Sequence, residues 1–209
     1  MLLFMSLRDR KRARTRQALI DAATELFTRQ GYDETTIADI AAAAEIGART
    51  FFSYFASKEE LVFPDADGRV QAAIDAIATR GPDEGPVDVL LRALGQINEA
   101  SDEMVSPLAA LRLRLIQTVP AVRGRALQIQ LDAQREIAEH LAEAFPDQLD
   151  LVRAAALTGA FVGAVSAALQ ALLDSADQAG PAALQHAMRT ATEVALAPWR
   201  APGGSRREP

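Results

Sequence analysis

The chain has four neighbouring side chains that suit contact with the base edges of DNA, namely Ala48, Arg49, Thr50 and Phe52. Arg49 is long enough to donate hydrogen bonds to O6 and N7 of guanine, while the other three offer mainly apolar contact to the methyl group of thymine. We therefore expect Arg49 to supply most of the base specificity. The alternative is that Arg49 caps a helix or forms an ion pair with Glu45, which would leave the bases to Thr50 and Phe52.

A second set of residues suits the sugar-phosphate backbone. Tyr54 and Lys58 follow the base-reading set, and Arg14 and Thr36 precede it. Hydroxyl, ammonium and guanidinium groups are common donors to phosphate oxygens, especially near a helix N-terminus. The first twenty residues carry six Arg or Lys against one Asp, so this segment is basic although the whole chain has a formal net charge of −6. A solvated arm and an amphipathic helix on a membrane surface are the alternatives for this segment.

Residues 36–61 are expected to position both sets as a helix-turn-helix. Thr36 is the expected N-cap of the first helix, with Asp39 in its first turn. One face of that helix is apolar and must be buried; it comprises Ile37, Ile40, Ala41 and Ala44. Gly47 marks the turn, where it either adopts φ > 0 or acts as a weak N-cap.

The second helix of the motif is expected over residues 48–55. Phe51 and Phe55 are spaced i, i+4 and would hold it to the core, which turns the base-reading side chains outward. A third helix would begin near Ser57 and be interrupted at Pro64.

The run over residues 36–61 resembles the DNA-binding domain of the TetR family of bacterial transcriptional regulators. The resemblance rests on T-x-x-D-I-A, R-T-F-F-x-Y-F and S-K-E-E-L, together with the preceding helix. It implies a three-helix head that binds an operator, with Tyr54 and Lys58 facing the phosphates. Two positions depart from the pattern: Gly47, where many members have a Ser cap, and Ala48, where many have a basic or polar residue.

The composition predicts an all-α protein. Ala and Leu dominate and aromatic residues make up only 5% of 209 residues, so good helix formers prevail. Periodicity and the spacing of Pro and Gly predict about nine helices, three in the head and the others in a larger bundle. The expected helices outside the helix-turn-helix cover residues 10–30, 57–79 with a break at Pro64, 87–100, 106–118, 120–145, 148–176 and 181–197.

We expect three parts along the chain: a DNA-binding domain over residues 1–62, an effector-binding and dimerisation domain over residues 63–198, and a disordered tail over residues 199–209. The absence of Cys excludes a disulfide framework, a Cys-ligated zinc site and a Cys nucleophile, and it fits a cytoplasmic protein. His140 and His186 lie far apart, and no phosphate-binding loop or nucleophile motif is present. We expect no catalytic site, metal or cofactor. A helical adaptor, or an enzyme without a recognisable motif, remains as an alternative.

Residues 105–145 contain L-R-L-R-L-I-x-T-V-P-A-V-R-x-R and resemble the C-terminal domains of TetR-family members that sense acyl-CoA-like ligands. The form R-T-F-F-x-Y-F is similar to that of the mycofactocin-regulator-like subgroup. Arg112, Arg114 and Arg123 beside an apolar seam would bind a CoA phosphate, with Phe161 at the edge of the acyl site. An equal alternative is that these arginines form ordinary ion pairs.

Residues 154–173 form a run of twenty residues without a charge, in which Gly159 and Gly163 allow helices to approach closely. The run is only modestly apolar, so we expect a buried helix of a soluble protein and no membrane span. The resemblance implies that the last two helices form the interface of a homodimer; packing within the chain is the alternative. We therefore expect a ligand-responsive repressor that binds a palindromic operator on double-stranded DNA and is released by an apolar small molecule such as an acyl-CoA.

Overall fold

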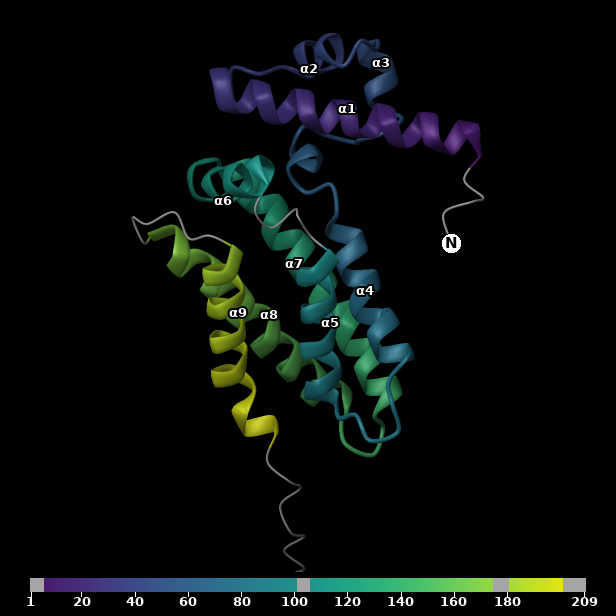
Figure 1. Ribbon diagram of the computed structural model, residues 1–209, viewed down its shortest axis with the longest axis vertical. Coiled ribbons are helices and arrows are strands. Elements are labelled where there is room, and N and C mark those ends of the chain that lie inside the picture. The colour runs from purple at the N-terminus through teal and green to yellow at the C-terminus, as the bar shows by residue number, and fades with distance from the viewer. Residues whose placement is uncertain (1–5, 101–105, 175–180, 201–209) are drawn as a thin grey trace, which may run out of the picture. The chain divides into compact units, whose positions relative to one another are not determined.

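Every regular element of the described chain is helical, as the composition predicts (Figure 1). The computed structural model describes residues 6–100, 106–174 and 181–200. Within these residues the elements are α1 (Leu7–Gln30), α2 (Ile37–Ala43), α3 (Ala48–Phe51), η1 (Glu59–Val62), α4 (Ala66–Ala78), α5 (Pro86–Ala100), α6 (Pro107–Thr118), α7 (Pro120–Ala144), α8 (Leu151–Asp174), α9 (Pro181–Leu196) and η3 (Ala197–Trp199). The expected all-α class is confirmed.

The ends of α1 follow from local capping. Ser6 Oγ accepts a hydrogen bond from the N–H of Asp9 at 3.1 Å, and the Asp9 carboxylate accepts one from the N–H of Ser6 at 3.2 Å. This capping box begins the helix at Leu7, earlier than the expected residue 10. Gly31 follows the last turn with φ 92°, a conformation that glycine adopts without the steric cost of a side chain. The expected stop at Gly31 is confirmed.

The described chain divides into two compact units. The first unit holds the described part of residues 1–65 together with Ser106–Leu127, and the second holds the described parts of residues 66–105 and 128–209. The sequence predicts a single boundary between the two folded domains, after residue 62. The structure differs because α6 and the start of α7 belong with the N-terminal helices.

One apolar core explains this division of the first unit. Its buried residues come from α1 (Leu19, Ile20, Ala23, Leu26, Phe27), from the segment that follows (Tyr32, Ile40, Phe51, Phe55, Leu61, Val62) and from α6 and the start of α7 (Leu111, Leu115, Val119, Val122). Burying each large apolar side chain stabilises the fold by about 1.5–3 kcal/mol. The apolar stripe of α6 is therefore sufficient to hold this helix against the N-terminal helices.

The second unit has a core of its own, built by α4, α5, α8, α9 and most of α7. α4 packs against α5, and α8 packs against α9, as Figure 1 also shows. Leu90, Leu141, Leu157, Met188 and Leu196 are fully buried at its centre. Each of the four helices that carry these residues therefore turns one apolar face inward.

α8 also has a second apolar face that the described chain leaves uncovered. Leu151–Ala171 is long and apolar enough to cross a membrane by length and composition alone, and only 33% of its most apolar window is buried. Val152 on α8 is 78% exposed, and Val194 on α9 is 73% exposed. A Cβ atom placed on Gly159 or Gly163 would meet nothing within 4 Å. The expected buried helix is thus buried on one side only.

The C-terminal end of α9 continues as η3, and Trp199 packs against the core of the second unit. The tail that the sequence predicts from residue 199 therefore does not include Trp199. Residues 201–209, on which the rest of that prediction falls, lie outside the described residues.

Candidate nucleic-acid interface

α2 begins with the cap that the sequence predicts. Thr36 Oγ1 accepts a hydrogen bond from the N–H of Asp39 at 3.1 Å, and the N–H of Thr36 donates to the Asp39 carboxylate at 2.9 Å. Hydrogen bonds from the Thr36 side chain and backbone hold the pKa of Asp39 below its ordinary value. Thr36 is exposed, but its hydroxyl is already engaged with this carboxylate.

In the turn between α2 and α3, Glu45 adopts the left-handed backbone conformation, with φ 56°. The left-handed conformation costs a residue with a side chain about 1–2 kcal/mol. Gly47 has φ −74° and ψ 146° and is the N-cap of α3, without a side-chain hydrogen bond. Of the two roles that the sequence allows for Gly47, the weak N-cap is confirmed, and the left-handed residue is Glu45 instead.

α3 ends at Phe51, earlier than the expected residue 55. A further turn follows, in which the N–H groups of Tyr54 and Phe55 donate to the carbonyl oxygen of Phe51 at 2.9 Å and 3.1 Å. Phe51 is fully buried and Phe55 is 3% exposed, with ring centres 6.0 Å apart. The prediction that these two residues anchor the helix is confirmed.

The four residues that the sequence predicts to contact bases are exposed, three on α3 and one directly after it. Ala48, Arg49, Thr50 and Phe52 are all exposed. Phe52 has 59% of its surface exposed, and its ring meets that of Phe51 edge-on, with centres 5.4 Å apart and an angle of 82° between the planes. Among the residues that the structure describes, the Arg49 side chain makes no hydrogen bond or ion pair, with Glu45 or with any other residue. Its guanidinium group is therefore available to a ligand.

Lys58 is tied to the interior of the first unit. Its ammonium group donates to the carbonyl oxygens of Tyr32 at 2.7 Å and Thr35 at 3.0 Å, and lies 3.9 Å from the centre of the Tyr32 ring. The Tyr32 hydroxyl donates to Glu59 at 2.7 Å, and burial together with this acceptor raises the pKa of Tyr32. Lys58 thus links the loop after α1 to the segment after α3. The sequence predicts a phosphate contact for Lys58 but does not predict this structural role.

Two arginines of α1 hold the segment that follows α3. Arg12 Nη2 donates to the carbonyl oxygen of Ser53 at 2.9 Å, and its Cζ lies 5.0 Å from the centre of the Tyr54 ring. Arg16 Nη2 donates to the carbonyl oxygen of Pro64 at 2.6 Å, and its Cζ lies 4.9 Å from the centre of the Phe55 ring. Each guanidinium group therefore combines a carbonyl acceptor with an aromatic face.

Two protein-family models match the chain. Residues 19–63 match the model described as bacterial regulatory proteins of the tetR family, and residues 84–195 match the MftR C-terminal domain. The chain belongs to the TetR family. This confirms the family resemblance in both parts of the sequence.

Curated relatives of this TetR-family chain are transcriptional regulators. TcmR of Streptomyces glaucescens is 35% identical over 141 residues, which cover 65% of this chain and 62% of TcmR. The putative mycofactocin biosynthesis regulator MftR of Mycobacterium tuberculosis is 30% identical, over 64% of this chain and 67% of MftR. The chain thus belongs to a family of DNA-binding transcriptional regulators, whose members are not enzymes.

Solved structures of TetR-family members share the fold. FadR of Thermus thermophilus, described as a transcriptional repressor in complex with lauroyl-CoA, has a TM-score of 0.54 and 21% identity, over 90% of this chain and all of that one. A regulator from a Rhodococcus species has a TM-score of 0.55 and 16% identity, over 87% of this chain and 98% of that one. These similarities show a common helical architecture.

Arg14 lies two residues from both Arg12 and Arg16, so helical geometry places it on another side of α1. It is exposed, and its side chain makes no hydrogen bond or ion pair with the described residues. The structure therefore brings Arg12, and not Arg14, to the segment that carries Tyr54. The sequence contains a signal for this contact. Helical spacing places Arg12 on the same face of α1 as the buried Leu19 and Ala23, and this favours Arg12 over Arg14.

The arginines predicted to bind an effector have different surroundings. Arg112 Nε donates to the carbonyl oxygen of Val62 at 2.6 Å, and Arg123 Nε donates to that of Ile116 at 3.0 Å, near the C-terminal end of α6. Arg114 is exposed, and its side chain makes no hydrogen bond or ion pair with the described residues. All three belong to the first unit, whereas Phe161 is 8% exposed in the core of the second.

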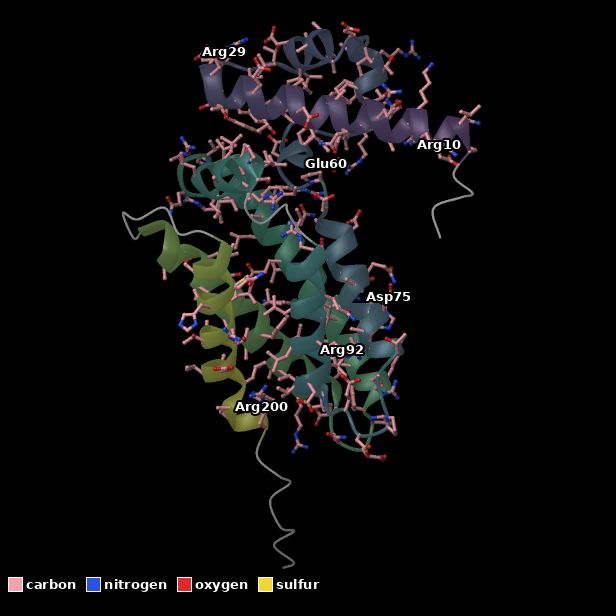
Figure 2. All side chains as sticks on the ribbon, in the orientation of Figure 1. Arg10, Arg29, Glu60, Asp75, Arg92 and Arg200 are labelled. Carbon is pink, nitrogen blue, oxygen red and sulfur yellow. The ribbon has the colours of Figure 1, made fainter. Side chains whose placement is uncertain are left out.

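An ion pair joins α7 to the segment after α3. Arg125 Nη2 lies 3.2 Å from Glu60 Oε1, and Glu60 Oε2 accepts a hydrogen bond from the N–H of Ala56 at 2.7 Å. Glu60 is labelled in Figure 2. Together with Arg112, this pair connects α6 and α7 to the DNA-binding helices within the first unit.

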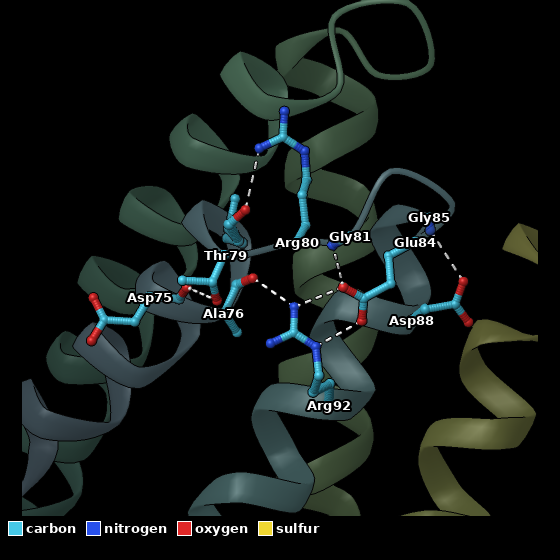
Figure 3. Close-up of polar contacts among 10 residues, drawn as sticks. Asp75, Ala76, Thr79, Arg80, Gly81, Glu84, Gly85, Asp88 and Arg92 are labelled. Carbon is cyan, nitrogen blue, oxygen red and sulfur yellow. Dashed lines mark hydrogen bonds and ion pairs between the residues drawn. The ribbon is translucent and has the colours of Figure 1, made fainter.

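The second unit has a polar depression of about 420 Å³, formed by the loops after α4 and α7. Glu84 accepts hydrogen bonds from Arg92 Nε at 2.7 Å and from the N–H of Gly81 at 2.8 Å, and Arg92 Nη2 donates to the carbonyl oxygen of Ala76 at 2.8 Å (Figure 3). These bonds hold the α4–α5 loop. No group of three or more His, Cys, Asp or Glu residues suited to a metal ion occurs in the described part of the chain.

Proposed function

We propose that this regulator is a ligand-responsive repressor, which binds a palindromic operator as a homodimer and is released by an apolar small molecule. The exposed face of α3 carries the DNA part of the proposal. Its exposed side chains are Arg49, Thr50 and Phe52. The buried Phe51 and Phe55 anchor the segment to the core. This face presents the guanidinium group of Arg49, which suits guanine, and the apolar surfaces of Thr50 and Phe52, which suit thymine methyl groups.

The homodimer is supported by the uncovered apolar face of α8 and α9. One recognition helix reads only a few base pairs, so two copies are needed on half-sites about 34–36 Å apart or at multiples of that spacing. The uncovered face contains Val152, Val194 and the open sites beside Gly159 and Gly163. An exposed apolar surface of this kind suits a second copy of the chain.

The effector part of the proposal rests on the second unit. Thr158 is fully buried, and its hydroxyl has no hydrogen-bond partner among the described residues. A buried hydroxyl without a partner is costly, so a ligand that supplies one would be favoured there. The FadR relative was solved with lauroyl-CoA. An acyl-CoA combines an apolar chain with a carbonyl acceptor, and Phe161, in the core of the same unit as Thr158, is a candidate contact for the chain.

Release requires that the effector bind the free form of the regulator better than the operator-bound form, because a ligand with equal affinity for both shifts nothing. α6 offers a physical route, since its Leu111 and Leu115 lie in the same core as Phe51. A ligand that displaces α6 would act on the DNA-binding helices through this core.

The DNA part is tested by selecting binding sites with the full chain and titrating the selected duplex over a salt series. We expect a palindromic site, and affinity that falls steeply with salt because each neutralised phosphate contributes about −0.9 to the logarithmic slope. Binding without sequence preference or salt dependence would overturn the proposal and favour a helical adaptor.

The dimer is tested by light scattering on the wild type, Gly163→Glu and Gly68→Glu. A Cβ at either glycine meets nothing within 4 Å, so both variants should fold. We expect a dimeric wild type, a monomeric Gly163→Glu and a dimeric Gly68→Glu. A monomeric wild type at micromolar concentration, or a dimeric Gly163→Glu, would contradict the proposed interface.

The effector is tested by a gel-shift panel of acyl-CoAs and other apolar metabolites on the selected operator. We expect one class to release the DNA at a lower concentration than the others. If the operator complex survives every acyl-CoA at saturation, the acyl-CoA assignment fails while the DNA-binding function stands.

A further inference from the structure

Arg12 joins α1 to the turn that directly follows the recognition helix α3. Its Nη2 donates to the carbonyl oxygen of Ser53 at 2.9 Å, and its guanidinium group lies over the Tyr54 ring, 5.0 Å from the centre. The donor and the acceptor are 41 residues apart in the chain. Because Arg12 is exposed while it makes both contacts, its effect on the core is small and its effect on the position of Ser53 and Tyr54 is direct.

The recognition helix depends on such contacts because it is short. α3 has four residues, and its N-cap Gly47 makes no side-chain hydrogen bond. Isolated helices of this length are unstable in water, and the carbonyl groups at the end of a helix lack partners within it. Phe51 and Phe55 hold one side of the segment in the core. Arg12 holds the other side and places a positive charge near the C-terminal end, where the helix dipole favours it.

We propose that Arg12 is a positioning residue for base recognition: it holds the end of α3 so that Arg49 and its neighbours meet the base edges in a fixed register. This inference rests on the proposed binding of an operator. It differs from a phosphate contact in its consequence. Loss of a phosphate contact weakens all DNA sequences equally and lowers the salt slope, whereas loss of positioning lowers the preference for the operator over other sequences.

The guanidinium group suits this role better than an ammonium group. Its planar face stacks on the tyrosine ring while an edge N–H reaches the carbonyl oxygen, and both contacts are made at once. Lysine would retain the charge for a phosphate but would lose the planar stack. Arg12→Lys therefore separates the two roles, even if Arg12→Ala were to fold poorly.

The experiment compares the wild type with Arg12→Lys, Arg12→Ala, Tyr54→Leu and the double variant Arg12→Ala/Tyr54→Leu, in the full chain. Arg29→Ala is the matched control, because it removes the same charge from the same helix at an exposed position near the other end of α1. Each variant is titrated with the selected operator and with a scrambled duplex over a salt series, and its melting temperature is measured without DNA.

We expect Arg12→Ala to lower the operator preference about tenfold and Arg12→Lys about threefold, with salt slopes close to that of the wild type. In the Tyr54→Leu background, Arg12→Ala should have a smaller effect on the preference than in the wild type, and Arg29→Ala should keep the wild-type preference. Full replacement by lysine, or an equal loss on both duplexes with a lower slope, would overturn the positioning role. A wild type that binds no duplex would instead overturn the proposed function.

Discussion

Arg112 on α6 donates a hydrogen bond from Nε to the carbonyl oxygen of Val62 at 2.6 Å, and its Cζ lies 5.9 Å from the centre of the Phe63 ring. The contact joins α6 to the segment that leads out of the helix-turn-helix, across 50 residues of sequence. Val62 is itself fully buried, so its carbonyl oxygen depends on partners within the protein. Arg112 therefore has a structural role in the first unit, whatever its role toward an effector.

Arg112→Ala should lower the free energy of unfolding by about 1–3 kcal/mol, because it leaves the Val62 carbonyl group without this donor. Thermal melting of the free protein measures the effect. Arg114→Ala is the control, since it removes the same charge two residues further along α6 from an exposed position and should stay within about 0.5 kcal/mol of the wild type. Equal melting temperatures for the two variants would contradict the structural role.

Arg49→Ala should weaken operator binding by about 1–3 kcal/mol and relax the preference at one base pair of each half-site. The reason is that Arg49 is the long exposed donor on α3 and is not engaged with Glu45. Selection of binding sites with the variant shows which position has lost its preference. An unchanged preference would assign base reading to Thr50 and Phe52 instead.

Lys58→Met should lower the melting temperature of the free protein, by an amount equivalent to about 1–2 kcal/mol, because the ammonium group bonds two carbonyl oxygens of the loop after α1. It should also weaken operator and scrambled DNA by similar factors, since a contact to a phosphate is lost. Lys11→Met, at an exposed position of α1, provides the control for charge. A melting temperature that does not move would leave the phosphate contact as the sole role of Lys58.

Thr158→Val should stabilise the protein by about 1 kcal/mol, because it removes a buried hydroxyl that has no described partner. Thr192→Val provides the contrast. The Thr192 hydroxyl donates to the carbonyl oxygens of Met188 at 2.8 Å and Arg189 at 2.9 Å, so its loss should be neutral or destabilising by about 0.5–1.5 kcal/mol. Urea unfolding at a fixed protein concentration measures both. If Thr158 meets the effector, Thr158→Val should also raise the effector concentration needed to release DNA.

The ion pair between Glu84 and Arg92 predicts a loss of stability in acid. The hydrogen bond from Arg92, followed by that from the N–H of Gly81, holds the pKa of Glu84 below its ordinary value of 4.5. A carboxyl group whose pKa is depressed in the folded state stabilises the fold above the unfolded pKa, and the stabilisation is lost as pH falls through the folded pKa. The gap in urea midpoint between wild type and Glu84→Gln should therefore be largest at neutral pH and close below pH 4.5.

Asp83→Asn is the control for this pH series. Asp83 is exposed and makes no hydrogen bond or ion pair with the described residues, so its variant should follow the wild type at every pH. A gap between wild type and Glu84→Gln that stays constant from neutral pH into acid would show that the carboxylate charge contributes nothing through Arg92.

The sequence by itself determined the local features of this protein. The capping box of Thr36 and Asp39 spans three residues, and the anchors Phe51 and Phe55 are one helical turn apart, so helical periodicity alone specifies them. The stop at Gly31 follows in the same way from the freedom of glycine. The family resemblance was carried by the same short-range pattern.

The tertiary structure decided which distant groups the long cations meet. Lys58, Arg12 and Arg112 donate to carbonyl oxygens that lie 26, 41 and 50 residues away. A carbonyl group is present at every residue, so no residue type marks the acceptor, and only the packing of α1 and α6 against the recognition segment brings one within reach. For the same reason the apolar stripe of α6 predicted a buried face but not its partner, because hydrophobic burial is non-directional until the whole core is assembled.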